Sequence, residues 1–133
     1  MLNMKNYGEL PDSMEPEEVA TCFNEILIEK NASKSDIIEA LGEMSDRQWH
    51  TYEVINPDLK EKITKWLIDH LDLENVEFVE LTIYISLRLG LEKIGKLLKE
   101  SLKKNLKPQV RKEIEETIDE IGNKWGDPYS GMK

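Results

Sequence analysis

Apolar side chains recur every three or four residues along most of the chain, which is the spacing of one face of an α-helix. An irregular stretch containing Gly8 and Pro11 precedes the first such series. We expect a helix that is capped by Ser13, has Pro16 in its first turn and ends near Asn31. Its apolar face consists of Val19, Phe23, Ile26 and Leu27.

A second helix is predicted after Ser33, because a new apolar face of helical spacing begins there. This face consists of Ile37, Ile38, Leu41 and Met44. Ser45 and Gln48 are spaced like a capping box, in which two side chains satisfy free N–H groups at the start of a helix. The pattern therefore predicts a separate short helix that carries Trp49, Tyr52 and Val54.

Prolines mark the starts of two further helices. Asn56 followed by Pro57 is typical of a cap and a first helical turn. The helix that follows has its apolar positions at Leu59, Ile63, Trp66, Leu67 and Leu71. Pro108 begins the last predicted helix, which ends at Gly122. An earlier helix is predicted along Leu91, Ile94, Leu98 and Leu102.

Residues 80–89 fit two patterns. Leu81, Ile83, Ile85, Leu87 and Leu89 alternate with more polar residues, which is the spacing of a strand. The same stretch also fills two adjacent faces of a helix, and Gly90 stands where a helix commonly ends. We predict a helix, which is apolar over so wide an arc that it should be the central buried one, and we keep a strand as the alternative.

These elements predict an all-α fold with a single helical domain spanning residues 1–133. We expect six or seven helices stacked as antiparallel pairs, either HEAT-like or as an irregular bundle. Residues 1–12 are predicted to form an irregular leader. Residues 123–133 are predicted to form a tail that docks on the body of the domain through Trp125 and Tyr129.

Length and composition exclude several classes of protein. The chain has 133 residues and a formal net charge of −9, which suits one globular domain. No apolar run approaches the roughly 20 residues that span a bilayer, and no apolar leader is apparent, so we expect a cytoplasmic protein that does not enter membranes. Cys22 is the only cysteine, which excludes an intramolecular disulfide and a multi-cysteine metal site.

Candidate catalytic chemistry is sparse. Asp46, His50 and Glu53 would share one helix face and form a weak candidate for a metal site, although a solvated face explains them more simply. His70 is interpreted as a histidine at the core boundary near Asp69. The glycines occur singly and form no phosphate-binding loop. We therefore predict a protein that is not an enzyme and has no catalytic residue, metal or cofactor.

Charge is distributed unevenly along the chain. Residues 1–55 contain 12 acids and 4 bases, whereas residues 91–133 contain 8 acids and 10 bases. The acids of the first two helices form two stripes at helical spacing, one of Glu18, Glu25 and Glu29 and one of Asp36, Glu39 and Glu43. If the helices pack as a hairpin, both stripes face solvent as one carboxylate surface. Solubility alone explains such stripes equally well.

A carboxylate surface favours a basic protein partner over nucleic acid, because phosphate binding depends on cationic contacts. Trp49 and Tyr52 are the predicted aromatic anchors of this partner-binding surface. The lysines at positions 96, 99, 103 and 107 could form a modest phosphate site. Because Glu92 and Glu100 interrupt this stripe, we interpret it as a solvated helix face.

The strings VEFVELTIYISLRLG, LEKIGKLLKESL and PQVRKEIEETIDEIG, within residues 57–122, resemble HEAT-type helix pairs. A small, acidic, helical chain without catalytic residues also resembles bacterial immunity proteins of the contact-dependent growth inhibition type. This resemblance implies a cytosolic antitoxin that neutralises a cognate, basic toxin domain, such as a nuclease, through a stoichiometric complex. The alternative is a helical adaptor or regulatory subunit that holds a peptide or protein on its stacked helices.

Overall fold

The computed structural model describes residues 7–11 and 13–128, which form six α-helices and two short 3-10 helices. The 3-10 helices are η1 (Tyr7–Glu9) and η2 (Gly122–Lys124). The described residues contain no strand, so the helical prediction for residues 80–89 is confirmed, as is the all-α fold. The α-helices are α1 (Pro16–Leu27), α2 (Lys34–Trp49), α3 (Pro57–His70), α4 (Val76–Leu89), α5 (Glu92–Ser101) and α6 (Pro108–Ile121).

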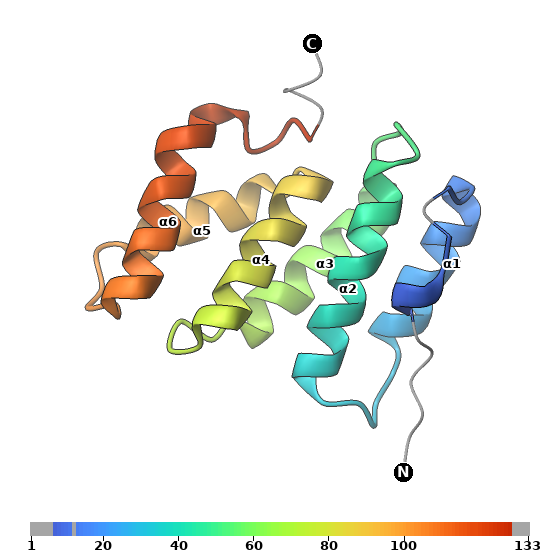
Figure 1. Ribbon diagram of the computed structural model, residues 1–133, viewed down its shortest axis with the longest axis horizontal. Helices are drawn as coiled ribbons and strands as arrows, with labels where there is room; N and C mark the ends of the chain where they lie inside the picture. Colours follow the sequence, from blue (N-terminus) through green and yellow to red (C-terminus); the bar gives the residue numbers. More distant parts are fainter. Residues whose placement is uncertain (1–6, 12, 129–133) are drawn as a thin grey trace.

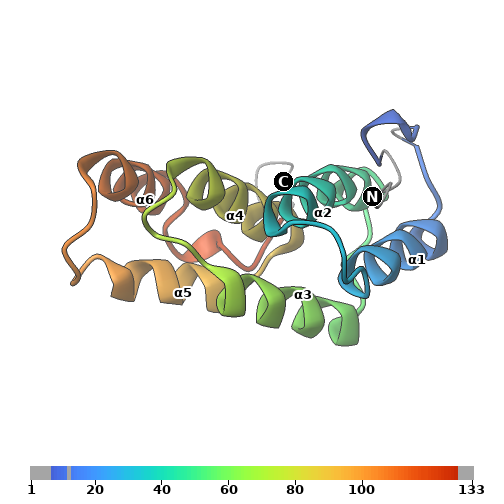
Figure 2. The same cartoon turned by 90° about the horizontal axis from the view of Figure 1, so that it is seen from below.

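The helices form two layers. Helices α2, α4 and α6 lie side by side in one layer, and α1, α3 and α5 form the other (Figures 1 and 2). Successive helices run in opposite directions and alternate between the layers (Figure 1). Helix α2 packs on α1 and α4, α4 packs on α5 and α6, and α3 packs on α1 and α5. The predicted stack of antiparallel helices is therefore observed.

Helix α4 is the central buried helix, as its wide apolar arc predicts. Asn75 caps it by accepting a hydrogen bond from the Phe78 amide at 3.1 Å. Gly90 ends it with a φ of 69°, a left-handed conformation that favours glycine. The hydroxyl groups of Thr82 and Ser86 donate to carbonyl groups of the same helix, so their polar atoms are satisfied within the core.

The start of α1 differs from the prediction. Glu15, not Ser13, is the N-cap residue. The Glu15 side chain accepts a hydrogen bond from the backbone of Glu18, whose own side chain accepts one from the backbone amide of Glu15. This reciprocal arrangement is a capping box made of two glutamates. The helix ends at Leu27, before the predicted end near Asn31.

The prediction of a separate helix beginning at Ser45 is wrong. Helix α2 continues without a break to Trp49, and the buried Ser45 hydroxyl donates to the carbonyl of Leu41 at 2.7 Å. Gln48 is also buried, and its amide donates to the carbonyl of Glu53 at 2.9 Å. The two side chains therefore stabilise the inside of α2 and the loop after it, so Tyr52 lies in a loop.

The tail after α6 returns to the body through Trp125, which is only 4% exposed. Its indole nitrogen donates to the Ser86 hydroxyl at 2.8 Å. The ring lies against Gly95 of α5 so closely that a Cβ atom there would be 2.7 Å from a ring carbon. Trp125 therefore connects the tail to α4 and α5. Tyr129, the other aromatic residue of the predicted contact, lies outside the described residues.

Alanine substitutions at two helical glycines should have opposite effects on stability. We expect Gly95→Ala to lower the free energy of unfolding by about 1–3 kcal/mol, because the new Cβ atom overlaps the Trp125 ring. Gly42→Ala should raise it by about 0.5–1 kcal/mol, because its Cβ atom would meet only Leu81 at 3.6 Å. Urea denaturation followed by circular dichroism checks both. Equal effects would contradict the tight contact with Trp125.

Candidate functional site

The end of the stack formed by α1 and α2 carries the predicted acidic stripes. Five of the six carboxylate residues are exposed, and Glu29 is half-buried. The sequence from Tyr7 to Glu29 contains no lysine or arginine. The exposed five are Glu18, Glu25, Asp36, Glu39 and Glu43.

Residues of η1 and the following turn lie next to both stripes. Tyr7 of η1 is 6% exposed, and Glu25 of α1 and Glu29, which follows α1, are near enough to act electrostatically on its hydroxyl. On the other side, Arg47 of α2 donates to the carbonyl groups of Gly8 at 3.1 Å and Leu10 at 2.9 Å. Carboxylates of α1 and α2 therefore border the same N-terminal segment.

Glu43 has a structural partner. Its carboxylate is 2.7 Å from Nη1 of Arg47, whose side chain is only 6% exposed. A buried guanidinium needs a nearby anion and hydrogen-bond acceptors. Glu43 therefore supports the Arg47 contact with the N-terminal segment. Arg47 was not among the predicted functional residues, although its spacing of four residues from Glu43 is the usual signal for an ion pair on a helix.

Two other carboxylates serve the local backbone. Glu18 accepts a hydrogen bond from the amide of Glu15, and Glu29 accepts one from the amide of Asn31 at 3.3 Å. The remaining three carboxylates, those of Glu25, Asp36 and Glu39, have no hydrogen bond or ion pair among the described residues. These three are therefore the members of the stripes that are available to a partner.

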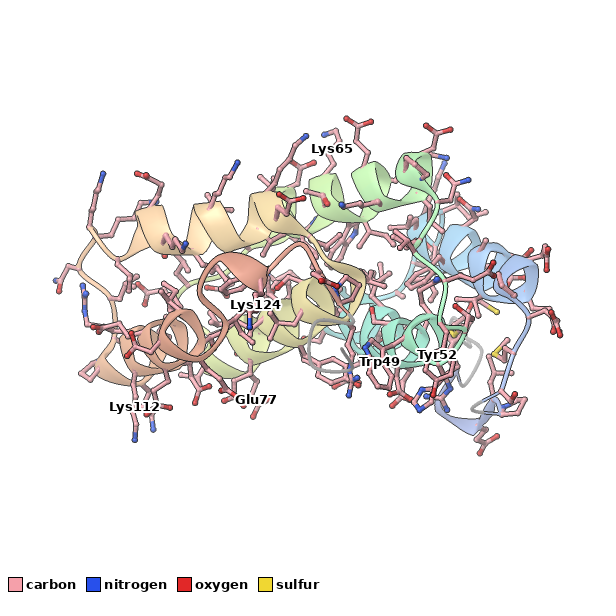
Figure 3. The ribbon with its side chains drawn as sticks, turned by 90° about the horizontal axis from the view of Figure 1, so that it is seen from above. Trp49, Tyr52, Lys65, Glu77, Lys112 and Lys124 are labelled. Carbon is pink, nitrogen blue, oxygen red and sulfur yellow. The ribbon has the colours of Figure 1, made fainter. Side chains whose placement is uncertain are left out.

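The predicted aromatic anchors lie next to each other at the C-terminal end of α2 (Figure 3). The indole nitrogen of Trp49 donates to the carbonyl of Pro128 at 2.8 Å, and the Arg88 guanidinium lies 4.5 Å from the ring centre. These contacts fix the half-buried Trp49 ring. Tyr52, whose ring centre is 6.2 Å away, is 63% exposed and presents most of its side chain to solvent.

The loop between α2 and α3 adds features that the sequence did not reveal. Tyr52 has a φ of 59°, and it is the only non-glycine residue with a positive φ among those that the structure describes. Val54 is 72% exposed, whereas Ile55 next to it is 4% exposed and fixes the loop to the core. A cavity of about 270 Å³ lies between this loop and the start of α1. It is lined by Pro16, Glu17, Ala20, Gln48, Glu53, Val54, Ile55, Asn56 and Leu59.

The lining of this cavity is apolar and acidic. The cavity is lined by apolar side chains and by the carboxyl residues Glu17 and Glu53. Its described lining includes no lysine or arginine. The cavity is smaller than the roughly 300–1,000 Å³ typical of small-molecule sites.

The weak metal candidate is not assembled. Glu53 lies beyond the end of α2, and Nδ1 of His50 is 2.8 Å from the backbone carbonyl of Asp46. Within residues 7–11 and 13–128, no group of three His, Cys, Asp or Glu residues could hold a metal ion. None of the helices described there combines the length and apolar character needed to cross a bilayer.

Comparison with known proteins gives no relative. No protein-family model matches the chain, and neither does any curated protein or solved structure.

The buried Tyr7 should make folding sensitive to alkaline pH. Burial raises the pKa of Tyr7 to about 12, and Glu25, Cys22 and Glu29 add to the rise. Because the folded pKa exceeds the unfolded value of about 10, the neutral phenol's contribution is complete below pH 10 and is lost as the pH rises to about 12. Comparing urea denaturation of the wild type and Tyr7→Phe across this range, with tyrosinate absorbance, checks this. A parallel pH dependence in both proteins would contradict it.

Backbone strain at position 52 predicts a difference between two variants that both lack the tyrosine ring. Tyr52→Gly should be more stable than Tyr52→Ala by about 1 kcal/mol, because only glycine adopts a positive φ without steric cost. Thermal and urea denaturation of the two proteins measure the difference. If alanine were equally stable, the loop would not hold position 52 in the left-handed conformation.

Proposed function

We propose that the protein is an immunity-type antitoxin that neutralises a basic toxin domain by forming a stoichiometric complex with it. The observation that carries this proposal is the surface at the α1–α2 end. There, the unpaired carboxylates of Glu25, Asp36 and Glu39 occupy the last turn of α1 and the first turns of α2, and the loop at the opposite end of α2 exposes Tyr52 and Val54. The resemblance of the acidic helical chain to immunity proteins supports the toxin as partner.

Electrostatics gives this surface a role in association. The chain has a formal net charge of −9. A field of one sign speeds the diffusional encounter of oppositely charged proteins toward about 10⁸–10⁹ M⁻¹s⁻¹ and weakens as salt is added. Because Glu25, Asp36 and Glu39 have no described partner to release, they can pair with a cationic surface directly.

The aromatic residues supply the short-range part of the proposed interface. Binding energy is commonly concentrated in a few aromatic and arginine residues near the centre of an interface. Trp49 is fixed by Pro128 and Arg88, so little side-chain entropy is lost when a partner covers it. Tyr52 lies beside it and is 63% exposed, so a partner can bury most of its side chain.

Co-purification followed by mass spectrometry can identify the partner, and the gene next to the one encoding this chain supplies the first candidate. We expect a basic protein that is toxic when expressed alone and harmless when expressed with this chain. Purified proteins should form a complex of fixed stoichiometry. An unfolded, neutral peptide as the specific partner would instead favour the adaptor alternative, and a complex that leaves toxicity unchanged would overturn the proposal.

Charge reversal tests the location of the binding surface. We expect the double variant Glu25→Lys, Glu39→Lys to lower the association rate constant with that toxin by roughly tenfold or more at low salt, and to flatten its salt dependence. Stopped-flow fluorescence measures both. Glu43 is left unchanged because its reversal would also disrupt Arg47.

A matched control separates local from global charge. The double variant Glu115→Lys, Glu120→Lys changes the net charge equally, but on α6 at the other end of the α2–α4–α6 layer (Figure 1). It should slow association much less. Equal slowing by both double variants would show that total charge, and not the α1–α2 surface, governs the encounter.

A further inference from the structure

A second cavity lies between α3 and α5, in the layer opposite the acidic stripe of α2. It has a volume of about 320 Å³ and opens to solvent. Its lining combines cationic, hydroxyl and apolar side chains, and it includes the first residues of α5. The lining residues are Pro57, Lys60, Glu61, Thr64, Leu91, Glu92, Lys93 and Lys96.

Thr64 provides an unusual polar group in this cavity. The residue is 6% exposed, yet its hydroxyl makes no hydrogen bond within the described part of the chain. The three other described helical threonines, Thr21, Thr82 and Thr117, each donate to the carbonyl four residues earlier, at 2.7–2.9 Å. The hydroxyl oxygen itself still reaches solvent, because it is not among the fully buried side-chain atoms that lack a partner. The Thr64 hydroxyl is therefore available to a ligand in the cavity.

The start of α5 adds a region of positive potential. The N-terminal amides of a helix lack partners within the helix and carry a partial positive charge, which favours anions. Leu91 is the N-cap residue, and no described side chain caps this end. The amides of Glu92 and Ile94 already donate to the carbonyl groups of Gly90 and Leu91, so an oxyanion in the cavity would meet one amide without a described partner, that of Lys93, in addition to the Thr64 hydroxyl.

Three lysines surround the cavity without forming an ion pair in the described residues: Lys60, Lys93 and Lys96. The acids Glu61 and Glu92 also line it, and the Glu92 side chain lies against Gly126 of the tail. The charge of these side chains is therefore positive by one unit before the helix terminus is considered. Lys65 of α3 extends from this same side of the molecule, opposite to Glu77 and Lys112 (Figure 3).

We propose that the α3–α5 cavity binds a small phosphate monoester. The phosphate would accept hydrogen bonds from the Thr64 hydroxyl and from the Lys93 amide in the first turn of α5. Lys60, Lys93 and Lys96 balance its charge, because lysine serves as a point charge for phosphate. Pro57, which is exposed, provides apolar surface for the organic part of the ligand. This site is independent of the proposed toxin-binding surface.

Titration of the full-length, ¹⁵N-labelled protein with inorganic phosphate and with phenyl phosphate, at constant ionic strength, tests the proposal. We expect saturable amide shifts at Thr64, Lys93 and Ile94, with dissociation constants in roughly the millimolar range and tighter binding of phenyl phosphate. Sodium chloride at the same ionic strength should not produce them. Shifts that never saturate, or that spread over all surface lysines, would overturn the proposal.

Substitutions test the chemistry of the site. Thr64→Val removes the hydroxyl at nearly constant shape and should weaken phosphate binding about fivefold, whereas Thr64→Ser should retain it. Lys96→Gln should weaken binding, and Lys99→Gln, on the same helix but outside the cavity, should not. Thermal denaturation confirms that each variant is folded. Equal affinities for Thr64→Val and the wild type, or equal effects of the two lysine variants, would contradict the proposed site.

Discussion

The burial of α4 is the constraint on which the two-layer arrangement depends. A helix with apolar side chains over so wide an arc must be covered on several sides to remove them from water. Helix α2 covers one side, while α5 and α6 cover others. The tail completes this cover, because the Trp125 indole reaches the Ser86 hydroxyl on α4. The outward faces of α2 and α3 are thereby left to carry charge.

Both chain ends are held by polar contacts to this core. Arg47 binds carbonyl groups of Gly8 and Leu10, and Trp49 binds the carbonyl of Pro128. Because Arg47 and Trp49 lie two residues apart at the end of α2, the segments that contain Leu10 and Pro128 approach the same end of that helix. The proposed partner-binding loop begins immediately after it. Both segments therefore pack at the end of α2 from which this loop starts.

Local patterns in the sequence were sufficient for most of the fold. The Asn56–Pro57 and Pro108 starts, the Gly90 and Gly122 ends, and the helical reading of residues 80–89 rest on spacing within one helix. Ser45 gave a wrong prediction of a helix start, because a serine can cap a helix or donate to a carbonyl within one, and only burial decides between them. Likewise, the role of Arg47 and the two cavities depend on contacts between distant segments, which no local pattern specifies.

The acidic stripes show why charge spacing alone did not define a binding surface. All six carboxylates fit the same helical pattern, but the fold separates them by function. Glu43 balances a buried guanidinium, and Glu18 and Glu29 accept backbone hydrogen bonds. These three carboxylates therefore already have partners within the folded chain. The other three, Glu25, Asp36 and Glu39, have no such partner among the described residues. They can therefore compensate an added positive charge without losing a contact of the folded chain, which makes these residues the more informative part of the surface.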